Sequence, residues 1–165
     1  MNKDANYWID KLGLQEHPEG GYFIETYKSR RIVNFDDFDG NRYICTAIYY
    51  LLMGNQVSSF HRMKSDEIWH FYTGSSLTIY IIHREGTLDE IRLGQNTDNN
   101  EVFQKVVESG SWFAAFVNDP TSYSLIGCTV SPGFDYHDWE LADITNLMHT
   151  YPQHRSIIEK FKQAF

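Results

Sequence analysis

Short segments rich in β-branched and aromatic residues, separated by turn residues, run through most of this sequence and limit the folds open to it. Glycine, proline, asparagine and aspartate punctuate the series, as in Asn118-Asp119-Pro120. Strands at this spacing predict a mainly β protein, either a β-barrel or a double-sheet jelly roll. The expected strands are Tyr22–Tyr27, Tyr43–Met53, Val57–His61, Ile68–Tyr72, Leu77–Ile82, Thr87–Leu93, Val102–Val107, Trp112–Val117 and Ser122–Val130.

The two ends of the chain have a helical rather than an alternating pattern. A short helix is expected at about residues 4–12, with Asp4 as its N-cap and Gly13 as its stop. Two further helices are expected within about 139–164, separated at Tyr151-Pro152. The chain is therefore predicted to form a single domain over 1–165, with the barrel at about 20–135. The polar segment Ser29 to Asn41 is expected to be a mobile loop.

Composition excludes several classes of partner. The formal charge of −8 disfavours nucleic acid and anionic membrane surfaces. No apolar run approaches the roughly 20 residues of a membrane span, and the N-terminus lacks a signal pattern, which predicts a soluble cytoplasmic protein. Cys45 and Cys128 lie in apolar segments and are expected to be buried free thiols.

One segment, Ser58–Gly74, carries a recognisable spacing of polar residues. His61-x-Met63-x-x-x-Glu67, followed by Gly74, is similar to the first cupin motif, except that Met63 stands where a second histidine is usual. The second cupin motif begins acceptably at Gly110, but its histidine position falls at Thr121.

Three segments in order resemble one cupin subfamily, cupin 5. They are His17–Tyr22, Ser58–His70 and Pro132–Glu140. The resemblance implies a double-stranded β-helix, an RmlC-like cupin jelly roll. It also implies a protein that is often dimeric and is related to cupins of the dTDP-4-dehydrorhamnose epimerase type.

A metal site is disfavoured by the residues at the motif positions. Only His61 and Glu67 remain as ligands, and the Met63 thioether suits hard divalent ions poorly. His70 is three residues from Glu67 on a strand and is expected on the opposite face. No cofactor is therefore expected, and a metal-dependent cupin enzyme with His61 and Glu67 as ligands is the second alternative.

Metal-free proton chemistry is the favoured hypothesis. A histidine beside a carboxylate can move a proton next to a carbonyl group, as sugar epimerases do. His61 and Glu67 are the predicted pair, and Tyr123 is expected to point inward and return the proton. The expected ligand is a small, sugar-like molecule. It is expected to contact Glu19, Tyr22, Glu25, Met63, Trp69, Thr121, Phe134 and Asp135.

Two other interpretations stay open. The barrel can bind or sense a ligand on its aromatic residues without converting it, or the His–Glu pair can be purely structural. The segment Tyr43–Met53 is apolar on both faces and needs cover. A homodimer is therefore expected, with outer barrel strands and the N-terminal segment at its interface.

Overall fold

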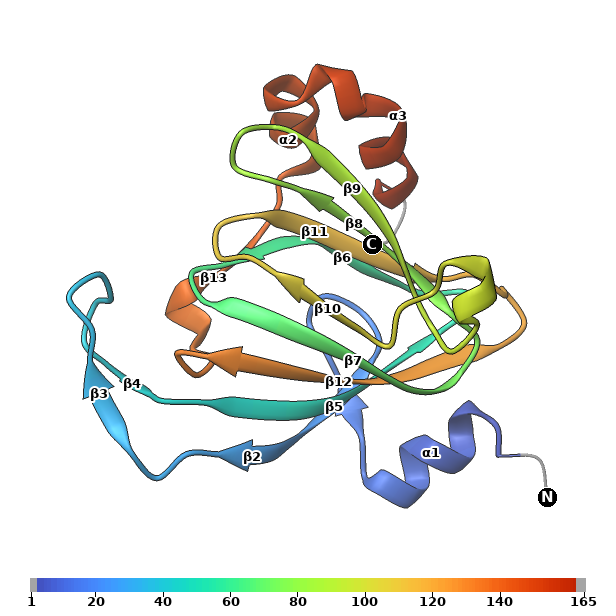
Figure 1. The fold of residues 1–165 in the computed structure, drawn as a ribbon, viewed down its shortest axis with the longest axis horizontal. Coiled ribbons are helices and arrows are strands. Elements are labelled where there is room, and N and C mark those ends of the chain that lie inside the picture. Colours follow the sequence, from blue (N-terminus) through green and yellow to red (C-terminus); the bar gives the residue numbers. More distant parts are fainter. Residues whose placement is uncertain (1–2, 163–165) are drawn as a thin grey trace.

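A computed structural model describes residues 3–162 of the chain and contains two antiparallel sheets that face each other (Figure 1). The first sheet has the order β1-β2-β5-β12-β7-β10 and the second the order β13-β6-β11-β8-β9. The first comprises β1 (Gln15–Glu16), β2 (Tyr22–Lys28), β5 (Thr46–Met53), β12 (Tyr123–Ser131), β7 (Asp66–Gly74) and β10 (Gln104–Val107). The second comprises β13 (Trp139–Leu141), β6 (Val57–Met63), β11 (Trp112–Val117), β8 (Leu77–Ile82) and β9 (Leu88–Leu93).

Strands distant in sequence lie side by side in both sheets, which confirms the predicted jelly roll. β12 lies between β5 and β7, and β11 lies between β6 and β8. Their inward side chains form the main core, with Trp69, Phe113 and Ile126 near its centre. Alternation assigns the two faces of each strand: on β6, His61 faces the interior while Phe60 faces the C-terminal helices.

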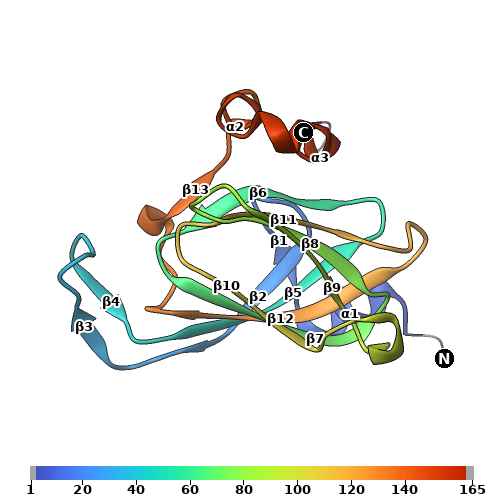
Figure 2. The ribbon, with the colours of Figure 1, turned by 45° about the horizontal axis from the view of Figure 1, so that its top comes forward.

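Helices cover parts of the outer faces of both sheets (Figure 2). α1 (Ala5–Leu12) begins at Asp4, whose side chain accepts a hydrogen bond from the Tyr7 amide, and ends at left-handed Gly13, as predicted. It packs on Leu51 and Leu125. The outer face of β5 is thus covered within one chain, which removes the reason given above for an interface there.

The C-terminal region differs from the expected pair of helices over 139–164. Residues 139–141 form β13, which extends the second sheet beyond the predicted barrel end at 135. Short helical segments then pack Phe161 against Phe60 and Tyr80. These segments are α2 (Ile144–Thr150), η3 (Pro152–His154), α3 (Arg155–Ile158) and η4 (Glu159–Phe161). Residues 163 and 164 of the prediction lie outside the described residues.

The segment predicted as a mobile loop is instead a two-stranded ribbon. β3 (Ile32–Asn34) pairs with β4 (Asn41–Tyr43), so the strand expected from Tyr43 begins only at Thr46. Two other short helical turns, η1 (Thr97–Asn99) and η2 (Tyr136–Asp138), lie in loops. Cys45 and Cys128 are free thiols. Within 3–162, no helix is both long and apolar enough to cross a membrane.

Candidate functional site

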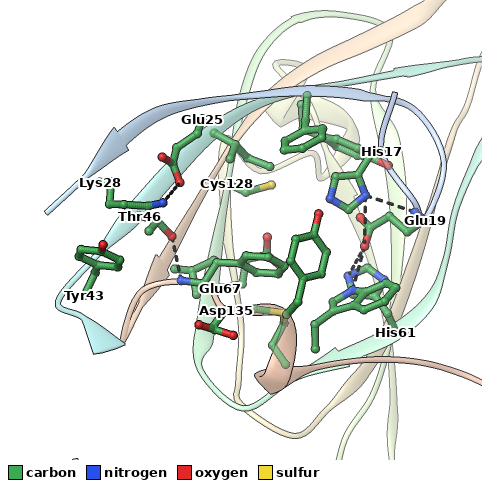
Figure 3. A pocket seen from close by; sticks show the side chains of 18 residues that line it. His17, Glu19, Glu25, Lys28, Tyr43, Thr46, His61, Glu67, Cys128 and Asp135 are labelled. Atoms are coloured by element: carbon green, nitrogen blue, oxygen red, sulfur yellow. Dashed lines mark hydrogen bonds and ion pairs between the residues drawn. The ribbon is translucent and has the colours of Figure 1, made fainter. Parts of the chain in front are cut away.

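A cavity of about 340 Å³ opens between the two sheets, beside the segment that carries η2 (Figure 3). Its volume falls at the lower end of the range of about 300–1,000 Å³ typical of small-molecule pockets. The lining comes from the segment before β2, from β2, β4, β5, β6, β7 and β12, and from residues 134–139. It comprises His17, Glu19, Phe23, Glu25, Lys28, Tyr43, Thr46, Ile48, Tyr50, His61, Met63, Glu67, Cys128, Val130, Phe134, Asp135, Tyr136 and Trp139.

His61 is fixed in one orientation on β6. Its Nδ1 lies 2.7 Å from the Ser59 carbonyl oxygen, which can only accept a hydrogen bond, so Nδ1 carries a proton. In the neutral ring, Nε2 is then an acceptor, and it lies 3.2 Å from Glu19 Oε2. Phe113 covers one side of the imidazole at a centroid distance of 4.0 Å.

Glu19 reaches His61 because of the turn between β1 and β2. Gly20 has a φ of 109°, and a Cβ at that position would lie 2.1 Å from the Val57 carbonyl oxygen, so only glycine fits. The Glu19 carboxyl accepts hydrogen bonds from the Ser58 hydroxyl at 3.1 Å and from the Trp139 indole at 3.3 Å. The carboxyl is thereby held against His61 in a buried position.

One proton is shared between Glu19 and His61. An unprotonated ring nitrogen and a carboxylate oxygen would repel each other at 3.2 Å, so the pair is stable when one of them carries a proton. Burial raises the pKa of Glu19 and lowers the pKa of His61, because each charged form loses its hydration. Both directions favour the proton on Glu19 beside a neutral imidazole.

Glu67 provides a second buried carboxyl, from β7. Burial raises its pKa from 4.5 to about 7, and the nearby His61 opposes that shift. The Trp69 indole lies beside it and lowers the pKa in part, yet that N–H has no partner in hydrogen-bonding geometry within 3–162. Glu67 also forms no ion pair with the described residues, so its carboxyl is available to a molecule in the cavity.

His17 is a second histidine in the cavity. Its Nδ1 accepts a hydrogen bond of 3.2 Å from the Glu19 amide, and its ring packs edge-on against Phe23 at 4.6 Å. Burial lowers its pKa, so the ring is neutral at neutral pH, with its proton on Nε2.

Two carboxylates that line the cavity, Glu25 and Asp135, have side-chain partners nearby. Lys28 Nζ lies 3.1 Å from Glu25 Oε2, and Asp135 Oδ1 lies 2.6 Å from His137 Nδ1. Lys28 is the one lysine or arginine among the lining residues within 3–162. The cavity therefore combines four carboxyl groups with a single cation that is already paired.

Seven of the predicted site residues line this cavity, and four do not. The seven are His61, Glu67, Glu19, Glu25, Met63, Phe134 and Asp135. Trp69 lies in the core, 1% exposed, and Tyr22 packs with α1 on the outer face of its sheet. Alternation along β2 separates Tyr22 from Phe23 and Glu25, so it could not line the cavity with them.

Tyr123 and Thr121 were placed inward by counting from Gly110, and this prediction was wrong. Residues 118–122 form a turn in which Asp119 accepts hydrogen bonds from the Thr121 amide and hydroxyl. β12 then begins with Tyr123 on the outer side of its sheet. There the Tyr123 hydroxyl accepts a hydrogen bond of 2.8 Å from the Trp8 indole. The residues of β12 that point inward are the even-numbered ones, including Ile126 and Cys128.

Several lining residues were not predicted. His17 was assigned to a turn, although its position two residues before Glu19 was a usable signal. Cys128 could have been found from strand alternation with Val130. His70 does face away from the cavity, as predicted, and lies 3.2 Å from the Thr129 hydroxyl.

The donor set does not fit a metal ion. Both nitrogens of His61 already have partners, and Met63 adds only a soft thioether. Among residues 3–162, no three His, Cys, Asp or Glu side chains are grouped as metal ligands. We derive no chemistry through a metal at this site.

Comparisons with known proteins place the chain in a family. A family model described as Cupin superfamily (DUF985) matches residues 6–142. The uncharacterized protein YML079W of Saccharomyces cerevisiae is 30% identical over 143 residues, which cover 79% of this chain and 71% of the yeast protein.

Solved structures agree with that assignment. Protein SO0799 from Shewanella oneidensis is 39% identical, with a TM-score of 0.88 and coverage of 98% of both chains. A hypothetical protein from Leishmania major is 32% identical, with a TM-score of 0.90 over 96% of this chain and 98% of its own. A mutant of Bacillus subtilis oxalate decarboxylase, 10% identical with a TM-score of 0.56 over 88% of this chain and 36% of its own, shares the fold alone. This chain belongs to the DUF985 family of the cupin superfamily.

Proposed function

We propose that this protein binds a small, uncharged, sugar-like carbonyl compound and moves a proton on it without a metal, as an isomerase or epimerase. The observation that carries the proposal is the buried Glu67 carboxyl, with a pKa of about 7, in the same cavity as the proton-sharing pair Glu19 and His61. Acid–base catalysts work best when their pKa lies near the operating pH.

The roles follow from the environments of the two carboxyls. Glu67 has no ion-pair partner within 3–162, so its carboxylate takes the proton from the carbon next to the carbonyl group. As that C–H bond breaks, a carbon–carbon double bond forms, and the carbonyl oxygen receives the proton held between Glu19 and His61. Isomerisation follows when Glu67 returns the proton to the neighbouring carbon while the hydroxyl on the first carbon gives its proton back to Glu19 and His61. Epimerisation follows when the planar intermediate turns over in the cavity before Glu67 returns the proton to the opposite face of the first carbon, and the enol hydroxyl gives its proton back to Glu19 and His61.

Charge and lining support an uncharged ligand. Asp135, whose pKa is lowered by hydrogen bonds from His137, and the ionised form of Glu67 would repel a phosphate or carboxylate, and Lys28 is already paired with Glu25. Tyr43, Tyr136 and Trp139 offer ring faces and polar groups of the kind that bind sugars.

Hydrogen–deuterium exchange tests the chemistry. The purified protein is incubated in D₂O with a panel of neutral aldoses and ketoses, and deuterium on the carbon next to the carbonyl is followed by NMR. Glu67→Gln and His61→Asn should each lower the exchange rate by at least about 100-fold, the typical contribution of general acid–base catalysis. Glu90→Gln, an exposed change on β9, is the matched control and should keep the wild-type rate.

Three outcomes would contradict the proposal. Undiminished exchange in both cavity variants would show that Glu67 and His61 are not involved. Saturable binding of a sugar with no exchange would favour the alternative of a binding or sensing module, which the aromatic lining also supports. Stoichiometric metal on untagged protein, lost in His61→Asn, would instead favour a metal-dependent enzyme.

A further inference from the structure

His17 lines the cavity, and its second ring nitrogen takes no part in the proton transfers proposed above. Its Nδ1 accepts a hydrogen bond of 3.2 Å from the Glu19 amide, so the proton of the ring is on Nε2. Phe23 and Tyr50 pack edge-on against the ring, with centroids 4.6 and 5.8 Å away, and hold it in this orientation. Within residues 3–162, Nε2 has no hydrogen-bond partner, although only 8% of the side chain is exposed. A buried donor is costly to leave unpaired, so a ligand that supplies an acceptor here is favoured over one that does not.

The other buried donors around Glu19 already have partners. The Tyr50 hydroxyl donates to a backbone carbonyl oxygen in the turn before β2, at 2.7 Å. The Trp139 indole donates to Glu19 Oε2 at 3.3 Å, and the Ser58 hydroxyl donates to Glu19 Oε1 at 3.1 Å. These three donors each have a single proton, so none of them is left for a ligand oxygen beside Glu19. His17 Nε2 differs from them because its proton is unused.

His17 also lies close to the pair that shares a proton. Its Nδ1 is 3.9 Å from Glu19 Oε2, and His61 Nε2 is 3.2 Å from that same oxygen. Figure 3 shows these three side chains together on one side of the cavity, with Glu25 and Lys28 on the other. Because Nε2 is in the same small ring as Nδ1, its proton is also near the Glu19 carboxyl. Two oxygens on adjacent carbons of one ligand can therefore meet the proton pair and His17 at the same time.

We propose that His17 Nε2 donates a hydrogen bond to a hydroxyl oxygen on the carbon next to the carbonyl group, so that the site selects α-hydroxy carbonyl compounds over their deoxy analogues. The inference rests on the proposed function, in which the carbonyl oxygen meets Glu19 and His61. A hydroxyl group can accept from His17 and still donate its own proton to that pair. His17 itself transfers no proton. In isomerisation the hydroxyl oxygen becomes the new carbonyl oxygen, and the bond from His17 is kept.

Two substitutions separate this donor from the hydrogen bond that His17 makes with the turn. His17→Asn keeps an acceptor oxygen near the Nδ1 position, where it can meet the Glu19 amide, and removes the donor at Nε2. His17→Gln is one carbon longer and brings an amide N–H group near the Nε2 position. Glu90→Gln, an exposed change on β9, is the control. The hydrogen–deuterium exchange assay is run with ribose and 2-deoxyribose and with glucose and 2-deoxyglucose, which all have a C–H bond next to the carbonyl.

The measured quantity is the ratio of kcat/KM for the hydroxylated sugar to that for its deoxy analogue. Intrinsic differences between the two sugars cancel when this ratio is compared between protein variants. His17→Asn should lower the ratio about tenfold, since one hydrogen bond to the ligand is lost, and His17→Gln should restore part of it. Glu90→Gln should keep the wild-type ratio. If His17→Asn leaves the ratio unchanged, or slows both sugars equally, His17 has no contact with the hydroxyl and the inference is overturned, while the proposed function stands.

Calorimetric titration decides the case in which the wild type exchanges none of these sugars, which is the failure of the proposed function itself. The same sugar pairs are then titrated into wild type and His17→Asn. Tighter binding of the hydroxylated sugar by wild type, lost in His17→Asn, would support the contact with His17 in a binding protein. Equal binding of both sugars, or binding of neither, would overturn it.

Discussion

The ionisation of Glu67 should make stability depend on pH in a direction opposite to that of an ordinary salt-bridged carboxylate. Its pKa is about 7 in the folded protein and 4.5 in an unburied glutamate. Between these values the unfolded chain releases the proton while the folded protein keeps it. The unfolded state is therefore favoured progressively as pH rises from 4.5 to 7, and the full cost remains above 7.

The size of the effect follows from the two pKa values. Each pH unit of separation corresponds to about 1.4 kcal/mol, so the total cost is about 3 kcal/mol. At pH 5 the loss of stability is less than about 1 kcal/mol, and at pH 8 it is close to the full value. Glu67→Gln cannot ionise and removes this dependence. The variant should gain about 2.5 kcal/mol relative to wild type between pH 5 and pH 8.

Urea unfolding of both proteins at pH 5, 6, 7 and 8 measures this change. Comparing wild type with Glu67→Gln at each pH is necessary because neighbouring groups also titrate. Burial raises the pKa of Glu19, which adds to the loss of stability at high pH. Burial lowers the pKa of His17 and His61, so they weaken the fold as pH falls below about 6.5. Both proteins contain these groups, and Glu67→Gln in addition removes the carboxylate that raises the pKa of His61.

The control is Glu90→Gln, which replaces an exposed glutamate outside the cavity and is measured at the same four pH values. A Glu67→Gln difference that changes by less than about 0.5 kcal/mol between pH 5 and pH 8 would refute the reasoning, since it would mean that the carboxyl is ionised in the folded protein at pH 5 already.

Two further substitutions test how the pocket is held together. Arg42→Met leaves the buried Asp138 carboxylate without the guanidinium that binds both of its oxygens. The free energy of unfolding, measured in urea, should fall by about 3 kcal/mol, and adding Asp138→Leu should restore part of that loss. Gly20→Ala forces a Cβ into the Val57 carbonyl oxygen and so displaces Glu19. The variant should have a lower melting temperature and should bind the ligand more weakly. Unchanged ligand binding would show that the turn does not position Glu19.

The barrel was predictable because its signals are local. Each strand carries its own alternation and its own turn residues, so the segment Leu77–Ile82 matches β8 without reference to any other part of the chain. The two-stranded ribbon of β3 and β4 was missed for the same reason. β3 and β4 are three residues each, and Asp36, Asp37 and Asp39 in the turn between them made the whole segment look like a polar loop.

The location of the site was also predictable, but its composition was only partly so. His61 and Glu67 face one cavity because they lie on the inner faces of β6 and β7, which motif spacing indicates. The contact between His61 and Glu19 joins residues 42 positions apart and depends on how a turn folds back over β6. Tyr123 was misplaced because counting through the turn at 118–122 could not reveal where β12 begins.

The N-terminal turn determines what lies beside His61 Nε2 and supports the proton chemistry that we propose. A metal ligand at His61 would need the Nε2 lone pair, and Glu19 Oε2 lies against that atom. Met63, which lines the cavity, adds a soft thioether, and Phe113, which packs on the His61 ring from the core, adds a hydrocarbon ring instead of a further hard ligand. Glu19 is thus the group beside that nitrogen, and in the proposed reaction the proton between the two is the one that is transferred. In this cupin the residue pattern of the turn His17-Pro18-Glu19-Gly20-Gly21 is therefore as informative about chemistry as the His–Glu spacing on the two central strands.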